Sequence, residues 1–208
     1  MGEFKNRVYG CAVVKAINAN YNADFSGQPR TLPDGSIYAT DKAFKYAVKN
    51  YLNDVYPELK IFGLKRYKED FVPYSLVEAF AKMFPDLKGS NDKKNVAHAL
   101  LSCFDIRTFG LTFAGKGKDD NLAISVHGPV QILYGANLWE KAQRYSDQIM
   151  SPFRNPDDKS EDKQSTTLGR QSRLDEGHYL HHFSINPINL RDITTLVSLK
   201  ICSKTYNL

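Results

Sequence analysis

Residues 18–49 limit the possible folds more than any other part of the chain, because a polar, asparagine-rich loop runs directly into an amphipathic helix there. Thr40 or Asp41 can cap the helix, since a side-chain oxygen at this position accepts a hydrogen bond from an unpaired backbone N–H. Free N–H groups and the helix dipole at such a start favour an anion. The sequence therefore predicts a helix start near residue 40 that can hold a phosphate group.

The predicted helix has two different faces. At about 3.6 residues per turn, its apolar face collects Phe44, Ala47, Val48, Tyr51 and Leu52. An outward stripe on a separate face collects Lys42, Lys45 and Lys49. Two of these lysines lie in the first turns, where the dipole disfavours a cation unless an anion is bound. The stripe indicates a bound phosphate, although a solvated charged face produces the same pattern.

The rest of the sequence predicts an α+β chain with a helical insertion. Short apolar or alternating runs predict strands at 7–17, 104–113 and 122–126, the first of them buried. Apolar residues at helical spacing predict helices at 75–84 and 91–102. A turn is expected at 33–36 and a bend at 128–129. The tail at 195–204 can form one more strand, with Val197, Leu199 and Ile201 on one face.

Residues 150–177 are strongly polar, and their large apolar residues are almost only Phe153, Leu168 and Leu174. Such a segment buries too little apolar surface to order by itself. From composition alone, a surface loop is the simplest interpretation.

Composition sets broad limits on the class of protein. The 208 residues suit one domain with an insertion, and 42% hydrophobic content can supply a core. A net charge of +5 attracts polyanions only moderately. The widely spaced Cys11, Cys103 and Cys202 argue against a zinc site or disulfide framework and fit a reducing cytoplasm. No apolar run approaches the ~18 residues of a membrane span, so neither export nor membrane insertion is expected.

Three patterns imitate catalytic or metal sites. The H-x-x-H-H run at 178–182 places neighbouring imidazoles on opposite faces of a strand, so packing or surface roles are expected rather than zinc. The glycine-lysine run at 115–120 lacks phosphate-loop spacing and predicts a hairpin turn. Cys103 near His98 has no orienting acid, so no nucleophile is assigned. The sequence thus indicates no catalytic group, metal or other cofactor.

Several ordered blocks between residues 7 and 192 resemble one known family. The first block holds Asn20-Tyr-Asn-Ala-Asp-Phe, Gln28-Pro-Arg and Gly35-Ser-Ile-Tyr-Ala-Thr-Asp-Lys-Ala-Phe-Lys-Tyr. Later blocks follow in order at 105–114, 128–132, 151–155, 168–169, 175–179 and 184–190. Together they are similar to the backbone subunit of the CRISPR-associated complex Cascade, most closely the type I-B form, in the Cas7 family of the RAMP superfamily.

The resemblance implies a fold with three parts. It predicts an RRM-like or ferredoxin-like palm of βαββαβ type at 1–41 and 104–208, helical fingers at 42–103, and a protruding thumb hairpin inserted at 148–177. Relatives continue with a further helix and strands beyond residue 192, whereas this sequence ends within sixteen residues. The tail strand replaces a palm strand, or the chain is a C-terminally shortened member.

The resemblance also implies a function. It predicts a non-catalytic, cytoplasmic subunit of a ribonucleoprotein in antiviral defence, which polymerises along CRISPR guide RNA and presents it to target DNA. Further copies of the chain and other Cascade subunits are the expected protein partners, and no membrane is involved. The expected RNA-binding residues, including apolar thumb contacts with bases, are Asn20, Asn22, Gln28, Arg30, Thr40, Lys42, Lys45, Lys49, Phe153, Arg154, Leu168 and Arg170. Phe153 can equally anchor the thumb on its own palm.

Two other functions stay open at this point. Asp24 lies where RNA-cleaving type III relatives carry an acid, which suggests a metal-dependent endonuclease. One carboxylate is too few for such a site, and the asparagine-rich loop around it suits turns. A free-standing RRM-like RNA-binding module is the third interpretation, although Phe109-Gly-Leu-Thr-Phe is only a fragment of the RRM strand motif.

Overall fold

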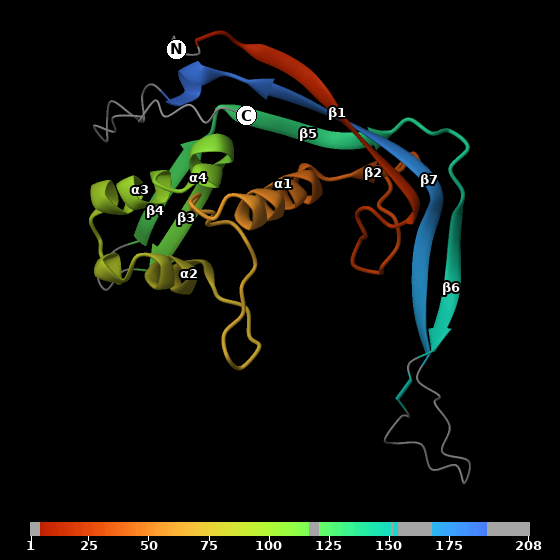
Figure 1. Cartoon of the computed structure of the whole chain (residues 1–208), viewed down its shortest axis with the longest axis horizontal. Helices are drawn as coiled ribbons and strands as arrows, with labels where there is room; N and C mark the ends of the chain where they lie inside the picture. Colours follow the sequence, from red (N-terminus) through yellow and green to blue (C-terminus); the bar gives the residue numbers. More distant parts are fainter. Residues whose placement is uncertain (1–4, 117–120, 151, 154–167, 191–208) are drawn as a thin grey trace. The chain divides into compact units, whose positions relative to one another are not determined.

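The computed structural model describes residues 5–116, 121–150, 152–153 and 168–190 (Figure 1). Its strands are β1 Val8–Ala19, β2 Tyr38–Ala39, β3 Gly110–Lys116, β4 Asn121–His127, β5 Val130–Asn137, β6 Arg144–Met150 and β7 Leu168–Ile185. Its helices are α1 Asp41–Val55, α2 Leu76–Met83, α3 Lys93–Leu101 and α4 Phe104–Phe109, with 3₁₀ turns η1 Pro85–Leu87 and η2 Pro187–Leu190. The fold is mixed α/β with antiparallel strand pairs, as the sequence predicted.

The chain divides into two compact units, which we describe separately. The first unit holds the described residues up to 10, then 45–132 and 183–190, and the second holds 11–44 and 133–182. Helix α1 and strands β1, β5 and β7 contribute residues to both units.

In the first unit, short helices surround a two-stranded hairpin. Strands β3 and β4 pair antiparallel from Gly110 opposite His127 to Lys116 opposite Asn121. Helices α2, α3 and α4 pack on this hairpin (Figure 1). The core between them is made by Phe62, Phe80, Val96, Ala99, Leu100, Leu101, Cys103, Ile106, Phe113, Leu122 and Val126. This cluster is what holds the short helices, since helices of this length are marginal alone.

In the second unit, a loop and the start of α1 accompany a sheet. The five-stranded sheet has the order β1-β7-β5-β2, and β6 pairs antiparallel with β7. Ala39, Leu174 and Tyr179 form a buried cluster, and Tyr21 packs against it. The β7 residues of this pair, Leu168–Leu174, belong to the polar stretch at 150–177.

Several sequence predictions are confirmed. Helices form at α1, α2 and α3, and strands form at β1 and β4, within two or three residues of the expected bounds. The turn at 33–36 forms around Gly35, whose φ of 87° suits glycine. Strands β3 and β4 form the predicted hairpin, although the turn residues 117–120 lie outside the described ones. The tail at 195–204 also lies outside them. No helix in the described ranges is long and apolar enough to cross a membrane.

The strand predicted at 104–113 is wrong in its first half. Residues 104–109 form helix α4, although Phe, Ile and Thr are typical of strands. Tertiary contacts override that preference, because Phe104 N–H donates to Lys60 O at 2.8 Å and Ile106 is buried in the core. Thr108 Oγ1 donates back to Phe104 O at 2.8 Å, and Gly110 ends the helix at φ 85°.

The prediction that the strand at 7–17 is buried is also wrong. Strand β1 lies at the end of the sheet order, and its alternate residues Tyr9, Val13 and Ile17 are exposed, so it is not a buried strand. A short apolar run does not reveal which strand will be an edge. Residues 168–177 of the polar stretch belong to β7, where Ser172 and Leu174 are buried. Pairing with neighbouring strands orders this part, which was expected not to order by itself.

Glu78 should make the stability of the chain depend on pH in the acid range. Its carboxylate binds Lys68 and accepts from Ser75 N–H at 2.9 Å in a capping box, and these contacts, led by Lys68, lower its pKa from 4.5 to about 2. A depressed pKa in the folded state gives stability that is complete above pH 4.5 and disappears as the pH falls toward 2. Glu78→Gln keeps an acceptor for the cap, so we expect a smaller decline in Tm over this range by circular dichroism. An unchanged pH profile would contradict the assignment.

Candidate nucleic-acid interface

The loop at 20–30 is held by its own side chains. Asp24 Oδ1 accepts hydrogen bonds from Ser26 N at 2.8 Å, Ser26 Oγ at 2.8 Å and Gln28 N at 2.9 Å. The bond from the Ser26 hydroxyl is the main cause that lowers the pKa of Asp24. Asn20 Nδ2 donates to Gly27 O at 3.0 Å. The interpretation of these residues as turn formers is therefore confirmed.

Asn22 and Thr40 join the loop to the start of α1. Asn22 Oδ1 accepts from Thr40 N at 2.9 Å and from Thr40 Oγ1 at 3.0 Å. Thr40 Oγ1 in turn accepts from Ala43 N at 3.3 Å, so Thr40 caps the helix as predicted. The two side chains that were expected to contact RNA thus fix the helix start.

Gln28 and Arg30 lie on the outgoing side of the loop. Gln28 Nε2 donates to Ser172 Oγ, which also shares a hydrogen bond with Ser146 Oγ at 2.6 Å across the β6–β7 pair. The Arg30 guanidinium carbon lies 5.9 Å from the centre of the Phe25 ring, and its buried Nε has no hydrogen-bond partner among the described residues. Gln28 therefore ties the loop to the hairpin, while Arg30 stays beside the loop tip.

The three lysines of α1 do not form one outward stripe. Lys42 is exposed on the first turn. Lys45 is half-buried, with Nζ 5.6 Å from the centre of the Phe109 ring. Lys49 is half-buried and donates to Gly63 O at 2.7 Å. The prediction that all three face solvent is wrong, because the chain at 60–64 and 104–109 packs against this side of the helix.

The apolar face of α1 also differs from its prediction. Phe44, Val48 and Leu52 are half-buried, whereas Ala47 and Tyr51 are exposed. The apolar side chains that α1 partly buries therefore form a narrower row of three than the sequence predicted.

Lys49 belongs to a cluster that the sequence analysis missed. The carboxylate of Asp105 is 3% exposed and accepts from Phe62 N at 2.9 Å and Gly63 N at 2.7 Å. A Cβ atom at Gly63 would lie 2.9 Å from both Asp105 Oδ2 and Lys49 Nζ, so both charged groups close around this glycine. Burial lowers the pKa of Lys49, and the charge of Asp105 opposes that shift. The one feature of the sequence that pointed to this cluster was Asp105 itself, the first residue of the block at 105–114.

The predicted hairpin contacts are described only in part. Phe153 is 77% exposed, and Arg170 is exposed in β7 opposite Gln148. Leu168 pairs with Met150 through its backbone, but its side chain and all of Arg154 lie outside the described part. The roles of these four residues in RNA binding remain predictions.

The histidines of the run at 178–182 have packing or surface roles, as predicted. His181 is fully buried, with Nδ1 3.0 Å from Leu133 O and its ring stacked on Phe44 at 5.0 Å between centres. His178 Nε2 lies 2.8 Å from Glu176 Oε1. Within the described ranges, no three His, Cys, Asp or Glu side chains gather as a metal site would require. The buried Cys103 thiol has its pKa raised to about 11, mainly by burial, as expected of an inert cysteine.

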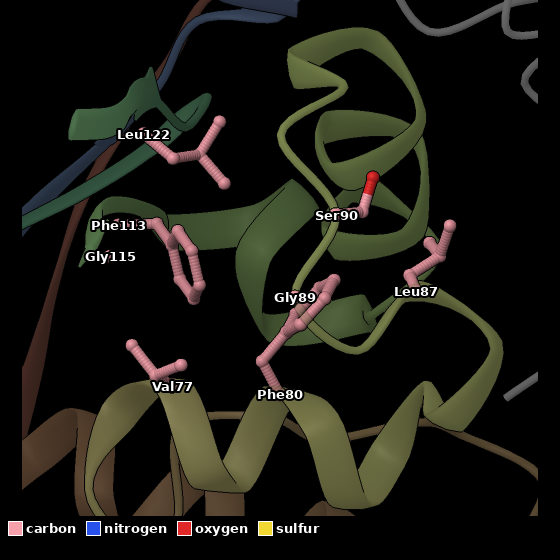
Figure 2. Close-up of a pocket in the computed structure, with 8 residues that line it drawn as sticks. All are labelled: Val77, Phe80, Leu87, Gly89, Ser90, Phe113, Gly115 and Leu122. Carbon is pink, nitrogen blue, oxygen red and sulfur yellow. The ribbon is translucent and has the colours of Figure 1, made fainter. Parts of the chain in front are cut away.

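A cavity in the first unit is too small for a ligand. Figure 2 shows it between α2, the loop at 87–90 and the β3–β4 hairpin, with Phe80 and Phe113 pointing into it. Its volume of about 30 Å³ holds one or two water molecules at most, and its lining is mainly apolar. A nucleotide does not fit in this volume.

Comparison with known proteins identifies the family. The family model described as CRISPR-associated protein Cas7 matches residues 6–198, so the chain belongs to the Cas7 family. No curated protein matches the sequence. This finding confirms the family that the ordered sequence blocks indicated.

Two solved structures are similar in fold. One, "CRISPR RNA-guided surveillance complex", has a TM-score of 0.48 at 14% identity and covers 93% of this chain and 55% of its own. The other, "CRISPR RNA-guided surveillance complex, pre-nicking", has a TM-score of 0.49 at 15% identity and covers 92% and 63%. The chain therefore spans less than two thirds of the length of these chains.

Proposed function

We propose that the chain is a non-catalytic backbone subunit that binds CRISPR guide RNA in a type I-B-like Cascade complex. Its membership of the Cas7 family over residues 6–198 is the observation that carries the proposal. In this role the subunit polymerises with further copies of itself along the guide, beside other Cascade subunits, in the cytoplasm. The guide then pairs with target DNA, so base pairing and not the protein reads the sequence.

The proposed arrangement keeps the three predicted parts. An RRM-like palm at 1–41 and 104–208, fingers at 42–103 and a thumb at 148–177 are the division we propose. Helices α2 and α3 in the fingers support this division, as does the antiparallel pairing of Gln148–Met150 with Leu168–Arg170 inside the thumb.

Within the site, backbone and base contacts come from different residues. Lys42 and Arg170 are exposed cations, and the exposed Phe153 is a candidate to contact bases. Asn20, Asn22, Gln28 and Thr40 act mainly by holding the loop and the helix start in place. Lys45 and Lys49 contribute positive charge from half-buried positions.

The endonuclease alternative relies on Asp24, and the geometry of this residue does not favour it. One carboxylate oxygen of Asp24 already accepts three hydrogen bonds within its own loop. A metal-dependent nuclease normally needs more than one such ligand. Labelled RNA that stays intact with the purified chain and Mg²⁺ would agree with the proposal, and cleavage lost in Asp24→Asn would establish the nuclease.

Lys42 should bind the RNA backbone. We expect Lys42→Ala to weaken binding of single-stranded RNA equally for all sequences, because a phosphate contact does not read bases. The slope of log K against log salt is negative, and removing one such contact should make it shallower by about 0.7. Fluorescence anisotropy with labelled RNA between roughly 50 and 200 mM salt measures both quantities.

Lys93→Ala is the matched control for this experiment, since Lys93 is an exposed lysine in the first turn of α3. Its loss should leave the salt slope unchanged if binding is specific to the start of α1. Equal effects of the two substitutions would reduce Lys42 to a general surface charge.

A further inference from the structure

Phe25 is a fully exposed aromatic ring on the tip of a hydrogen-bonded loop. The tip is closed by the bridge between Ala23 and Pro29 and by the hydrogen bond from Asp24 N to Gln28 O at 2.8 Å. The Asp24 carboxylate adds three more hydrogen bonds inside the loop. An apolar ring in contact with water is unfavourable in free energy, and a partner that covers the ring would remove that cost.

The surroundings of the ring suit a flat partner. The neighbouring Ala23, Ser26 and Gly27 are small and exposed, so they leave room for a planar group beside the ring. Neither buried apolar cluster of the described residues includes Phe25, whereas a protein hot spot is typically ringed by other contacts that exclude water. A nucleobase needs only the face of one aromatic ring to stack on.

The charge near the ring also favours a nucleic acid. Arg30 lies beside the ring, with its guanidinium carbon 5.9 Å from the ring centre, and so places a positive charge next to it. Phe71 offers a contrast, as it is 85% exposed on another hairpin tip at φ 61°. Two acids, Glu69 and Asp70, come directly before Phe71, and they repel phosphates. Phe25 follows the single acid Asp24, whose carboxylate is engaged by three hydrogen bonds of its own loop. Among the described residues, a cation lies over the ring of Phe25 and none over that of Phe71.

We propose that Phe25 stacks on an unpaired nucleobase of the bound nucleic acid, with Arg30 close to the adjoining sugar-phosphate. This inference rests on the proposed function, and it adds a base contact in a loop where polar contacts alone were expected. The base belongs either to the guide RNA or to the target strand, because stacking chemistry is the same for both.

Binding of a labelled 30-nucleotide oligo(U) RNA by the full chain tests the proposal. Phe25→Ala should weaken binding about fivefold to a hundredfold, the range for one stacked base, without changing the salt slope. Phe25→Leu, which keeps apolar area but no ring, should weaken it similarly. Phe25→Trp should retain affinity, and its added indole fluorescence should be quenched by RNA above the constant signal of Trp139. Phe71→Ala is the matched control and should bind as the wild type does.

A second arm uses a guide-length RNA with and without complementary DNA. A loss in Phe25→Ala with RNA alone assigns the base to the guide, and a loss only after DNA is added assigns it to the target strand. Wild-type RNA binding that is unchanged in Phe25→Ala in both arms overturns this inference and leaves the proposed function standing. Unchanged RNA affinity with lost self-association would show instead that the ring docks on protein. A wild-type chain that binds no RNA overturns both proposals.

Discussion

Asp105→Ala should lower the free energy of unfolding by about 3 kcal/mol, the scale of a broken buried polar network. The substitution removes a buried carboxylate and leaves the N–H groups of Phe62 and Gly63 without their acceptor. It also leaves the half-buried Lys49 ammonium without the nearby anion that opposes its desolvation. Urea unfolding at constant temperature measures the loss.

Substitutions at the same cluster separate hydrogen bonding from charge. Asp105→Asn keeps one acceptor and should cost less than Asp105→Ala. Lys49→Met should also destabilise, and its effect should be non-additive with Asp105→Ala because the two groups interact. Lys42→Ala, on the exposed side of the same helix, should stay within about 0.5 kcal/mol of the wild type. A stable Asp105→Ala variant would contradict a structural role for the cluster.

Gly110→Ala should destabilise the chain by about 3 kcal/mol or more, since it combines backbone strain with a steric clash. Gly110 has φ 85°, a conformation that L side chains rarely adopt. An added Cβ would overlap Val126 O and lie 2.6 Å from Gly128 N, where β3 and β4 meet. We expect a large fall in Tm, or loss of the native near-UV spectrum.

Gly115→Ala, at the other end of β3, is the matched control. An added Cβ there would lie 3.5 Å from both Phe113 Cε1 and Val77 Cγ2, in ordinary contact beside the small cavity. Removing the extra chain entropy of a glycine should stabilise the fold by about 0.5 kcal/mol. Equal destabilisation by both substitutions would show that β3 tolerates no side chain at either end, and the conformation of Gly110 would then not be the cause.

Two of the three lysines of α1 have structural contacts, so their substitution would affect stability as well as RNA binding. A combined replacement of Lys42, Lys45 and Lys49 does not isolate a surface stripe, because Lys49 holds Gly63 O and Lys45 lies over Phe109. Loss of RNA binding in such a variant would mix unfolding with lost charge. Lys42 alone gives a clear measurement.

Local chemistry made several elements predictable. The Thr40 cap, the turn formers around Asp24 and the alternating residues of β4 each depend on neighbours within a few positions, so sequence was sufficient. The family was also predictable, because ordered blocks along most of the chain are specific even when single motifs are not.

Long-range contacts decided the remainder. The sequence by itself determined that α1 is amphipathic. Only the tertiary structure decided that Lys49 donates to Gly63 O and lies near Asp105, which follows Lys49 by 56 positions in the chain. Residues 104–109 became a helix and 168–177 a strand because partners distant in sequence outweighed local propensity and composition. The exposure of Phe25 was equally hidden, since its neighbours in sequence do not reveal whether a ring will find a core to pack against.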